Sequence, residues 1–370
     1  MKRNRGRTVH VETLAEFDQR IRDGATALRG WRVSGLDLRQ RSGVLHRVQL
    51  AGATFLGCLF APGDRHLAED AGALVLPTIS GVPVDPYRST LYTPGELYDA
   101  TAYADTLDAR AYAWCQQDRQ QGADDTLARA LHDHAIDEAL DRWTARLHRG
   151  GQRIVGVMGG HDAQRGDADF ALAARLGRSL GQTHVVATGG GPGAMEAANL
   201  GAWMAGHGTV ELTEALGLLG RVPGFRPSVQ AWADEAFGVR GRFAVEEAPV
   251  RSLGIPTWHY GHEPPNVFAD AIAKYFRNAT REAILLEVCD AGIVFLPGAG
   301  GTVQEIFQDA CENYYADESS VAPMILLGAE YWTETLPAWP LLQRLAKGRV
   351  MEGHVHLADS VEEVVALVRR

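Results

Sequence analysis

The chain has 370 residues, of which 46% are hydrophobic and 22% charged, an ordinary globular composition that excludes collagen, coiled coil and long disorder. Its 36 basic and 46 acidic residues give a net charge of −10, the wrong sign for binding phosphate backbones, so we expect no nucleic-acid partner. Four scattered cysteines without a Cys-x-x-Cys pair, and no run of 18 apolar residues, predict a cytoplasmic protein that does not span a membrane.

Residues 1–149 are predicted to form a separate N-terminal α+β accessory region. Within it, Val48, Ala53 and Cys58 follow one another at a spacing of five in the string VQLAGATFLGCLF, which resembles three turns of a pentapeptide-repeat β-helix. Two ordinary strands explain the same string equally well. Further along, apolar residues from Leu127 to Leu147 recur at helical spacing and predict a long amphipathic helix that leads to a boundary at Arg149–Arg153.

Residues 150–370 repeat one pattern: a short apolar run, a glycine-rich turn and a helical segment. The predicted strands are Ile154–Met158, His184–Thr188, Leu253–Trp258, Gly292–Leu296, Met324–Leu327 and His354–Leu357. The predicted helices are Ala168–Leu180, Gly193–Ala205, Asn266–Val288, Gly301–Tyr314 and Val361–Arg369. Strands alternating with crossover helices predict an α/β domain with a doubly wound, Rossmann-like parallel sheet. A longer insert, Val210–Arg251, is expected to hold short helices that form a lid or an oligomer contact.

The first glycine-rich turn, TGGGPGAMEAAN (Thr188–Asn199), follows the second predicted strand and opens a helix. Glycines let a ligand approach the backbone, and free N–H groups at a helix start favour an anion. The turn therefore suggests a phosphate or ribose site, although a turn that only packs has the same pattern. Its candidate binding residues are Gly189, Gly190, Gly191, Gly193 and Glu196. It is not the dinucleotide fingerprint, which follows a first strand.

The second turn, LPGAGGTVQE (Leu296–Glu305), follows the fourth predicted strand. The amides of Gly298, Gly300 and Gly301 and the hydroxyl of Thr302 are candidates for holding a phosphate. Glu305 lies one helical turn further on, where it would place a carboxylate near that ligand. No Gly-Lys-Ser/Thr occurs, so P-loop hydrolysis of ATP or GTP is excluded.

These two turns in this order, with NATREAILLEVCDA between them, resemble the LOG family of cytokinin-activating phosphoribohydrolases over roughly residues 153–370. By size the chain is more similar to the larger bacterial nucleotide 5′-monophosphate nucleosidases of that superfamily. The resemblance implies that Glu305 and Arg281 are catalytic. It also implies three departures: Ala299 replaces a family glycine, Glu282 replaces a lysine, and Gly159-Gly160-His161 replaces a Gly-Ser pair. Gly159 and Gly160 remain candidate phosphate contacts.

The segment after the third predicted strand offers further contacts at the edge of the sheet where ligands bind. Trp258 is a candidate for stacking on a base, and His262, Glu263 and Asn266 are candidates for base or ribose contacts. An irregular solvated loop would have the same composition. The histidines lack metal-ligand spacing, so we expect no metal, and the reaction implied by the resemblance requires no cofactor.

The expected function is that of a nucleoside 5′-monophosphate phosphoribohydrolase, a hydrolase that releases free base and ribose 5-phosphate. The alternative is a non-catalytic nucleotide or molybdenum-cofactor carrier of the same fold, which has no need of Glu305. Proteins with this motif have also been labelled lysine decarboxylases, but Lys274 is the only interior lysine available for a Schiff base, and we expect it on a helix. We expect a homo-oligomer, because the predicted helix Asn266–Val288 is more apolar than one buried face requires.

Overall fold

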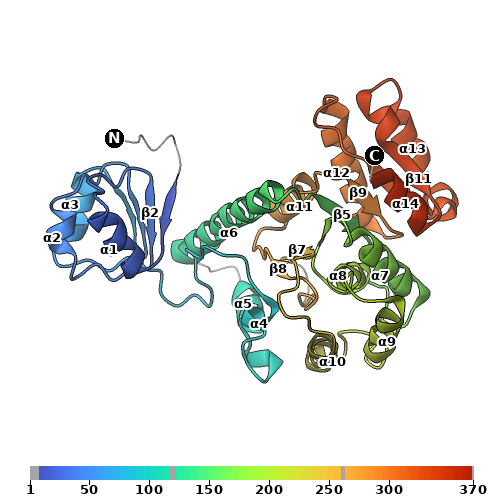
Figure 1. The fold of residues 1–370 in the computed structure, drawn as a ribbon, viewed down its shortest axis with the longest axis horizontal. Helices are drawn as coiled ribbons and strands as arrows, with labels where there is room; N and C mark the ends of the chain where they lie inside the picture. The colour runs from blue at the N-terminus through green and yellow to red at the C-terminus, as the bar shows by residue number, and fades with distance from the viewer. Residues whose placement is uncertain (1–7, 117–121, 260–262, 369–370) are drawn as a thin grey trace. The chain divides into compact units, whose positions relative to one another are not determined.

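A computed structural model describes residues 8–116, 122–259 and 263–368, and their contacts divide the chain into two compact units (Figure 1). The first unit holds the described residues up to Arg88 and from 122 to Ala135, and the second holds the others. Residues 89–116 thus belong with the α/β unit although they precede the expected boundary at 149. The predicted long helix is present as α6 (Ala123–Arg149), which begins in the first unit and ends in the second.

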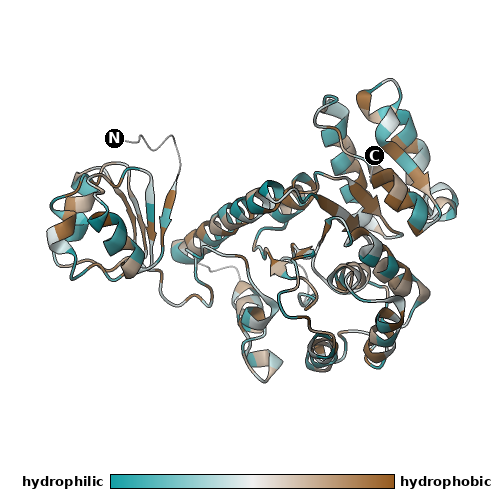
Figure 2. Ribbon diagram, in the orientation of Figure 1, coloured by the Kyte–Doolittle hydropathy of each residue, from teal (hydrophilic) through white to brown (hydrophobic). Residues whose placement is uncertain are grey.

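The second unit is built on a seven-stranded parallel sheet of order β11-β10-β9-β5-β6-β7-β8. Its strands are β5 (Ile154–Met158), β6 (Val185–Thr188), β7 (Ser252–Gly254), β8 (Ala271–Ile272), β9 (Ile293–Phe295), β10 (Met324–Leu327) and β11 (Val355–Ala358). All residues of β5, β6, β9 and β10 are buried, as expected for parallel strands covered on both faces, and Figure 2 shows the hydrophobic strands of this sheet. The predicted doubly wound, Rossmann-like fold is confirmed.

Helices connect and cover these strands. They are α4 (Pro94–Leu97), α5 (Leu107–Gln116), α7 (Ala168–Leu180), α8 (Ala194–Trp203), α9 (Thr209–Leu219), α10 (Val229–Arg242), α11 (Asn278–Glu287), α12 (Gly300–Tyr315), α13 (Ala338–Ala346) and α14 (Val361–Val368). The predicted insert contains α9 and α10, so the expectation of short helices there is confirmed. Within the described residues, no helix is both long and apolar enough to cross a membrane.

The predicted helix Asn266–Val288 is wrong over its first half. Residues 271–272 form the edge strand β8, paired with β7, and the helix begins only at Asn278. Tyr92 and Ile272 form an antiparallel bridge on the other side of β8, with amide–carbonyl distances of 2.9 and 2.8 Å. Lys274 therefore lies between β8 and α11 rather than on a helix. Apolar strand and helix segments in succession produce the same continuous hydrophobic run.

This correction removes the argument for an oligomer interface at that segment. Val267, Phe268, Ile272, Tyr275 and Phe276 are all buried within the chain itself, so they leave no apolar surface to be covered by a second copy. The homo-oligomer remains a prediction without that support. Light scattering tests it, and a particle of about the 40.1 kDa chain mass at micromolar concentration would contradict it.

The first unit is a small parallel solenoid. Its strands β1 (Val9–Val11), β2 (Trp31–Ser34), β3 (Thr54–Leu56) and β4 (Leu74–Leu76) pair in sequence order, with helices α1 (Leu14–Arg22), α2 (Ser42–Leu45) and α3 (Asp64–Asp70) between them. Val9 pairs with Trp31 and Arg32 with Thr54, so each of the first two coils takes 22 residues, and Thr54 pairs with Leu74, so the third takes 20. The string from Val48 to Phe60 thus contributes one strand, β3, and the three-turn pentapeptide reading is wrong.

Candidate functional site

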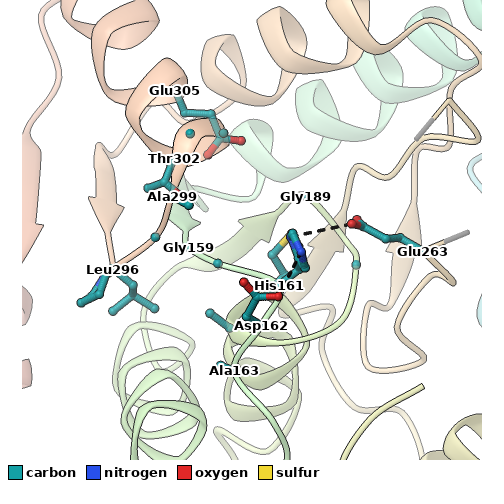
Figure 3. Close-up of a pocket in the computed structure, with 18 of the residues that line it drawn as sticks. Gly159, His161, Asp162, Ala163, Gly189, Glu263, Leu296, Ala299, Thr302 and Glu305 are labelled. Atoms are coloured by element: carbon teal, nitrogen blue, oxygen red, sulfur yellow. Dashed lines mark ion pairs between the residues drawn. The ribbon is translucent and has the colours of Figure 1, made fainter. Parts of the chain in front are cut away.

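A cavity of about 720 Å³ lies at the carboxyl ends of β5, β6 and β9 (Figure 3). The chain runs outward from β5 through β6 to β8 and then returns to place β9 on the other side of β5, so the strand order reverses between β5 and β9. Open α/β sheets bind ligands at such a reversal, because the loops on either side of it diverge and leave a crevice. The cavity is therefore where the fold itself predicts a ligand.

The second glycine-rich turn forms one wall of this cavity. Ala299 precedes α12 with φ −95°, so no left-handed conformation is needed there and alanine replaces the family glycine without strain. A Cβ on Gly298 would overlap the side chain of Thr302, whereas Cβ atoms on Gly300 and Gly301 would meet nothing within 4 Å. Packing does not require glycine at positions 300 and 301, and the helix start is left open to a ligand.

Glu305 and Arg281 face each other across this end of the cavity, from α12 and α11. Arg281 Nη1 lies 3.9 Å from Glu305 Oε1, and Arg281 Nη2 donates to Asn278 Oδ1 at 2.8 Å. The side chains of Glu305 and Arg281 are only 15% and 11% exposed. The arginine is thus oriented by Asn278, and one of its amino groups is directed toward the carboxylate.

Glu282 occupies the position where the resemblance to the LOG family implies a lysine, and hydrogen bonds fix it in place. Its Oε1 accepts from Asn278 Nδ2 at 2.6 Å and its Oε2 accepts from Gln304 Nε2 at 2.8 Å. Arg281 Nη2 lies 3.6 Å from Glu282 Oε1. The substitution therefore adds a second carboxylate beside Arg281, and the contacts of the lysine are not replaced at this position.

Burial raises the pKa of Glu305 to about 7; Arg281 opposes this rise and the Glu282 carboxylate adds to it. A carboxyl group with this pKa exchanges its proton near neutral pH, which is the property required of a general acid or base. Asp309, one turn further along α12, has a pKa raised to about 8 by burial. Asp309 does not line the cavity, and its Oδ1 accepts a hydrogen bond from Asn313 Nδ2 at 3.2 Å.

Replacing Asp309 with asparagine should stabilise the protein at alkaline pH. The folded-state pKa of about 8 lies above the ordinary aspartate value of 3.8, so the folded state retains a proton that the unfolded chain loses, and stability falls as pH rises from about 4 to about 8. The isosteric amide keeps the acceptor for Asn313 and does not titrate. We expect a gain in unfolding free energy of about 1–3 kcal/mol at pH 8 and none at pH 4. Denaturant unfolding at both values measures it, and an equal difference at the two pH values would contradict the titration of Asp309.

The first glycine-rich turn forms the opposite wall. Gly189 and Gly191 line the cavity, and Gly190 and Gly193 have positive φ angles of 71° and 75°. Cβ atoms on Gly190 and Gly193 would crowd Pro256 Cδ at 2.7 Å and the His161 carbonyl oxygen at 2.6 Å, respectively. These two glycines therefore shape and pack the turn, while Gly189 and Gly191 face the ligand space.

Buried amide and hydroxyl groups hold this turn in place. Thr188 Oγ1 donates to Asn199 Oδ1 at 2.7 Å and accepts from the amide of Gly190 at 2.9 Å. Asn266 Nδ2 donates to the carbonyl of Gly191 at 3.1 Å and to Asn199 Oδ1 at 3.0 Å. Asn266 is fully buried and does not line the cavity. It therefore holds the turn in place and does not make the predicted ligand contact.

Two further predicted contacts lie away from the cavity lining. Glu196 is buried in an ion pair with Arg165, whose Nε lies 3.1 Å from Glu196 Oε1 and whose Nη1 donates to the carbonyl of Trp232 at 3.0 Å. Trp258 is buried, stacks on Phe276 with ring centroids 4.6 Å apart, and is unavailable to a base. Both side chains are already fully engaged in the protein interior. His262 lies outside the described residues.

The remaining predicted residues do line the cavity. They are Gly159, Gly160, Gly189, Gly191, Glu263, Arg281, Gly298, Gly300, Gly301, Thr302 and Glu305. Thr302 is buried with its hydroxyl turned toward Gly298, so it supports the loop. Four residues that no sequence pattern marked as contacts also line the cavity: His161, Asp162, Gln304 and Tyr331. Tyr331 donates a hydrogen bond of 2.9 Å to the carbonyl of Gly298 from a turn that follows β10, and no motif marks it.

If the resemblance to the phosphoribohydrolases holds, Arg281→Ala should lower kcat for release of the base by roughly 10–100-fold. This is the effect of losing one charge-assisted contact. Because Arg281 holds the pKa of Glu305 down, the alanine variant should also shift the pH-activity midpoint upward. Arg281→Lys is the control, since it keeps the charge but loses the planar fork. Unchanged kinetics with a lowered melting temperature would mean that Arg281 is only a structural ion-pair partner.

Neither a cluster of potential metal ligands nor Lys274 lies in the cavity among the described residues. No group of three or more His, Cys, Asp and Glu side chains among the described residues is arranged to hold a metal ion. Lys274 is buried with its Nζ 2.6 Å from Asp108 Oδ1, and it does not line the cavity. A Schiff base on Lys274 would require breaking that buried ion pair.

No family model matches the sequence, and no curated protein does. Similar solved structures include a molybdenum cofactor binding protein from the phototrophic bacterium Rippkaea orientalis, at 20% identity, covering 59% of this chain and 96% of that one with a TM-score of 0.38. Another is a Moco carrier protein from Chlamydomonas reinhardtii, at 19% identity with the same coverage and a TM-score of 0.36. At these scores the comparisons do not decide between functions.

Proposed function

We propose that the chain is a nucleoside 5′-monophosphate phosphoribohydrolase, which hydrolyses the N-glycosidic bond to give free base and ribose 5-phosphate. The observation that supports this most is Glu305. Its carboxyl group is largely buried, has a pKa raised to about 7, and lies beside Arg281 in the cavity at the strand reversal. A protein that only bound an anion would gain nothing from burying a carboxylate there.

The reaction requires a carboxylate and a positioned water, because the ribose becomes oxocarbenium-like as the bond to the base breaks. The ionised Glu305 would stabilise the positive charge at C1′ and accept a proton from the attacking water. The water oxygen forms the new bond to C1′, and the electron pair of the broken C1′–N bond leaves with the base. The proton on Glu305 then passes to the departing base, which balances the reaction and restores the carboxylate.

The 5′-phosphate would bind at the open start of α12. The unobstructed space at Gly300 and Gly301 and the helix N-terminus favour an anion, and Arg281 adds a guanidinium close by. A phosphate held at the first turn of α12 would place its ribose near the next turn of the helix, which carries Glu305. In this arrangement phosphate, ribose and carboxylate would follow one another in the order that the reaction needs.

The second candidate function, a nucleotide or molybdenum-cofactor carrier, uses the same glycine-rich turns to bind phosphate. It differs in needing no group that exchanges a proton near neutral pH. The buried Glu305, with its raised pKa, favours the hydrolase because this burial costs stability above pH 5 and gives a carrier no advantage.

A panel of AMP, GMP, IMP, CMP and UMP tests the proposal. The purified protein should convert at least one of them to free base, detected by chromatography, at a rate proportional to enzyme concentration. Tight binding of a nucleotide with no release of base by any member of the panel would favour the carrier instead.

A further inference from the structure

The charged side chains that line the cavity are predominantly acidic. Among the described residues that line it, Arg281 is the one arginine or lysine, whereas the carboxylates are Asp162, Asp167, Asp169, Glu263, Glu282 and Glu305. Glu282 and Glu305 lie within 3.6 and 3.9 Å of Arg281, on the wall proposed to hold the ribose and phosphate. The wall away from Arg281 therefore presents hydrogen-bond acceptors to the remaining part of the ligand, which in a nucleotide is the base.

Glu263 is the carboxylate best placed to contact that base. Its Oε1 lies 3.7 Å from His161 Nδ1, and a Cβ on Gly191 would be 3.6 Å from its Oε2. Its side chain is 34% exposed, and Figure 3 shows it across the cavity from Thr302 and Glu305. Both carboxylate oxygens therefore lie at the cavity wall formed by the loops after β5 and β6.

The backbone near Glu263 is firmly attached to the first glycine-rich turn. Asn266 donates its amide to the carbonyl of Gly190 at 2.8 Å and its side chain to the carbonyl of Gly191 at 3.1 Å. Asn266 is fully buried, so these bonds are protected from water. The chain is thus fixed by buried hydrogen bonds three residues after Glu263.

An ionised carboxylate only accepts hydrogen bonds, and the bases differ in what they offer it. Guanine presents a ring N–H and an amino group side by side, which match the two carboxylate oxygens. Hypoxanthine and uracil present a single N–H. Adenine and cytosine present an amino group beside a ring nitrogen whose lone pair would face the anion. A site built to accept two hydrogen bonds rejects ligands that lack the donors.

Resting on the proposed function, we propose that Glu263 is a specificity-determining residue that selects guanine, so that GMP is the preferred nucleoside monophosphate. The carboxylate receives the ring N–H and the amino group of guanine, while Glu305 acts at C1′ on the opposite wall. The order of kcat/KM should be GMP, then IMP, then AMP, and each lost charge-assisted contact should reduce kcat/KM by roughly 10–100-fold.

Glu263→Gln tests this by exchanging an acceptor for a donor. The amide of glutamine accepts from an amino group and donates to the neighbouring ring nitrogen of adenine. The variant should lose roughly 10–100-fold in kcat/KM for GMP and gain for AMP, so that the GMP:AMP ratio reverses. Asp162→Asn makes the same change of charge on the same wall and should leave that ratio unaltered. An equal change of the ratio in both variants would overturn the role of Glu263.

If Glu263→Gln does not fold, Glu263→Asp should lose the GMP preference without gaining AMP activity.

The two proposals fail in different ways. Hydrolysis of GMP, IMP and AMP with equal efficiency would overturn the selection by Glu263 and leave the hydrolase intact. Absence of hydrolysis would overturn the hydrolase, and calorimetric titration with GMP and AMP then decides the role of Glu263. Tighter binding of GMP that Glu263→Gln abolishes would support the role, and equal binding or none would overturn it.

Discussion

Replacing Glu305 with glutamine should lower kcat for base release by ~10²–10⁴ while changing nucleotide affinity only a few-fold, because the amide keeps the shape of the side chain but neither carries charge nor accepts a proton. The wild-type kcat/KM should rise with pH through about 7, since Glu305 must be ionised to act as the base. The variant should lose that dependence. Rapid-quench or steady-state assays of free base across pH 5 to 9 measure both effects.

Stability provides the control for this variant. The folded-state pKa of Glu305, about 7, lies above the ordinary glutamate value of 4.5, so the wild-type carboxyl costs stability as pH rises from about 4.5 to 7. Glutamine removes that cost, so the variant should unfold at the same or a higher denaturant concentration at pH 8. Wild-type turnover in a folded Glu305→Gln protein would remove Glu305 from the mechanism.

The second large effect concerns the 5′-phosphate. Adenosine should be hydrolysed ~10²–10⁵ less efficiently than AMP, because a phosphate gains two or three charge-assisted hydrogen bonds of roughly 1.5–3 kcal/mol at the start of α12, some of which water replaces. ATP should also be a poor substrate. Additional phosphates would meet a cavity that is lined by six carboxylates. Arg281 is the one arginine or lysine among the described residues that line it.

Comparing kcat/KM for adenosine, AMP and ATP measures this selectivity. The same three compounds with Gly301→Ala provide a matched test, because a Cβ at position 301 would meet no protein atom within 4 Å. That variant should fold normally and lose most of the preference for AMP. Equal efficiency for adenosine and AMP in the wild type would mean that the glycine-rich turns serve only for packing.

The fold was largely predictable because each strand of a parallel sheet is buried on both faces and leaves an uninterrupted apolar run in the sequence. Five of the six predicted strands of the second unit are present within one residue of their expected bounds, whereas the predicted strand Leu253–Trp258 is wrong beyond Gly254, where β7 ends. The two glycine-rich turns follow β6 and β9. The seventh strand, β8, was not predicted because its two residues merge with the apolar stretch before α11. The solenoid of the first unit was missed because its coils of 20 to 22 residues are set by pairing between distant segments, as between Arg32 and Thr54.

The candidate site was predictable where a motif marked it and unpredictable where burial decided the outcome. Glu305, Arg281 and most glycines of the two turns line the cavity as expected, whereas Gly190 and Gly193 pack within the first turn. Trp258 does not, because its indole N–H donates to Asp108, 150 positions earlier in the chain, at 2.8 Å. Similarly, Glu196 lies within a helix start but pairs with Arg165 in the interior. Such pairings depend on tertiary contacts that no local sequence pattern contains.

The most direct test of the proposed hydrolysis is the stoichiometry of its products. GMP should disappear with equal amounts of free guanine and ribose 5-phosphate appearing, each measured by chromatography and mass spectrometry, and Glu305→Gln should form both at a rate lower by ~10²–10⁴. Release of inorganic phosphate and guanosine in place of these products, or complete recovery of the whole panel of nucleoside monophosphates after prolonged incubation, would contradict cleavage of the N-glycosidic bond.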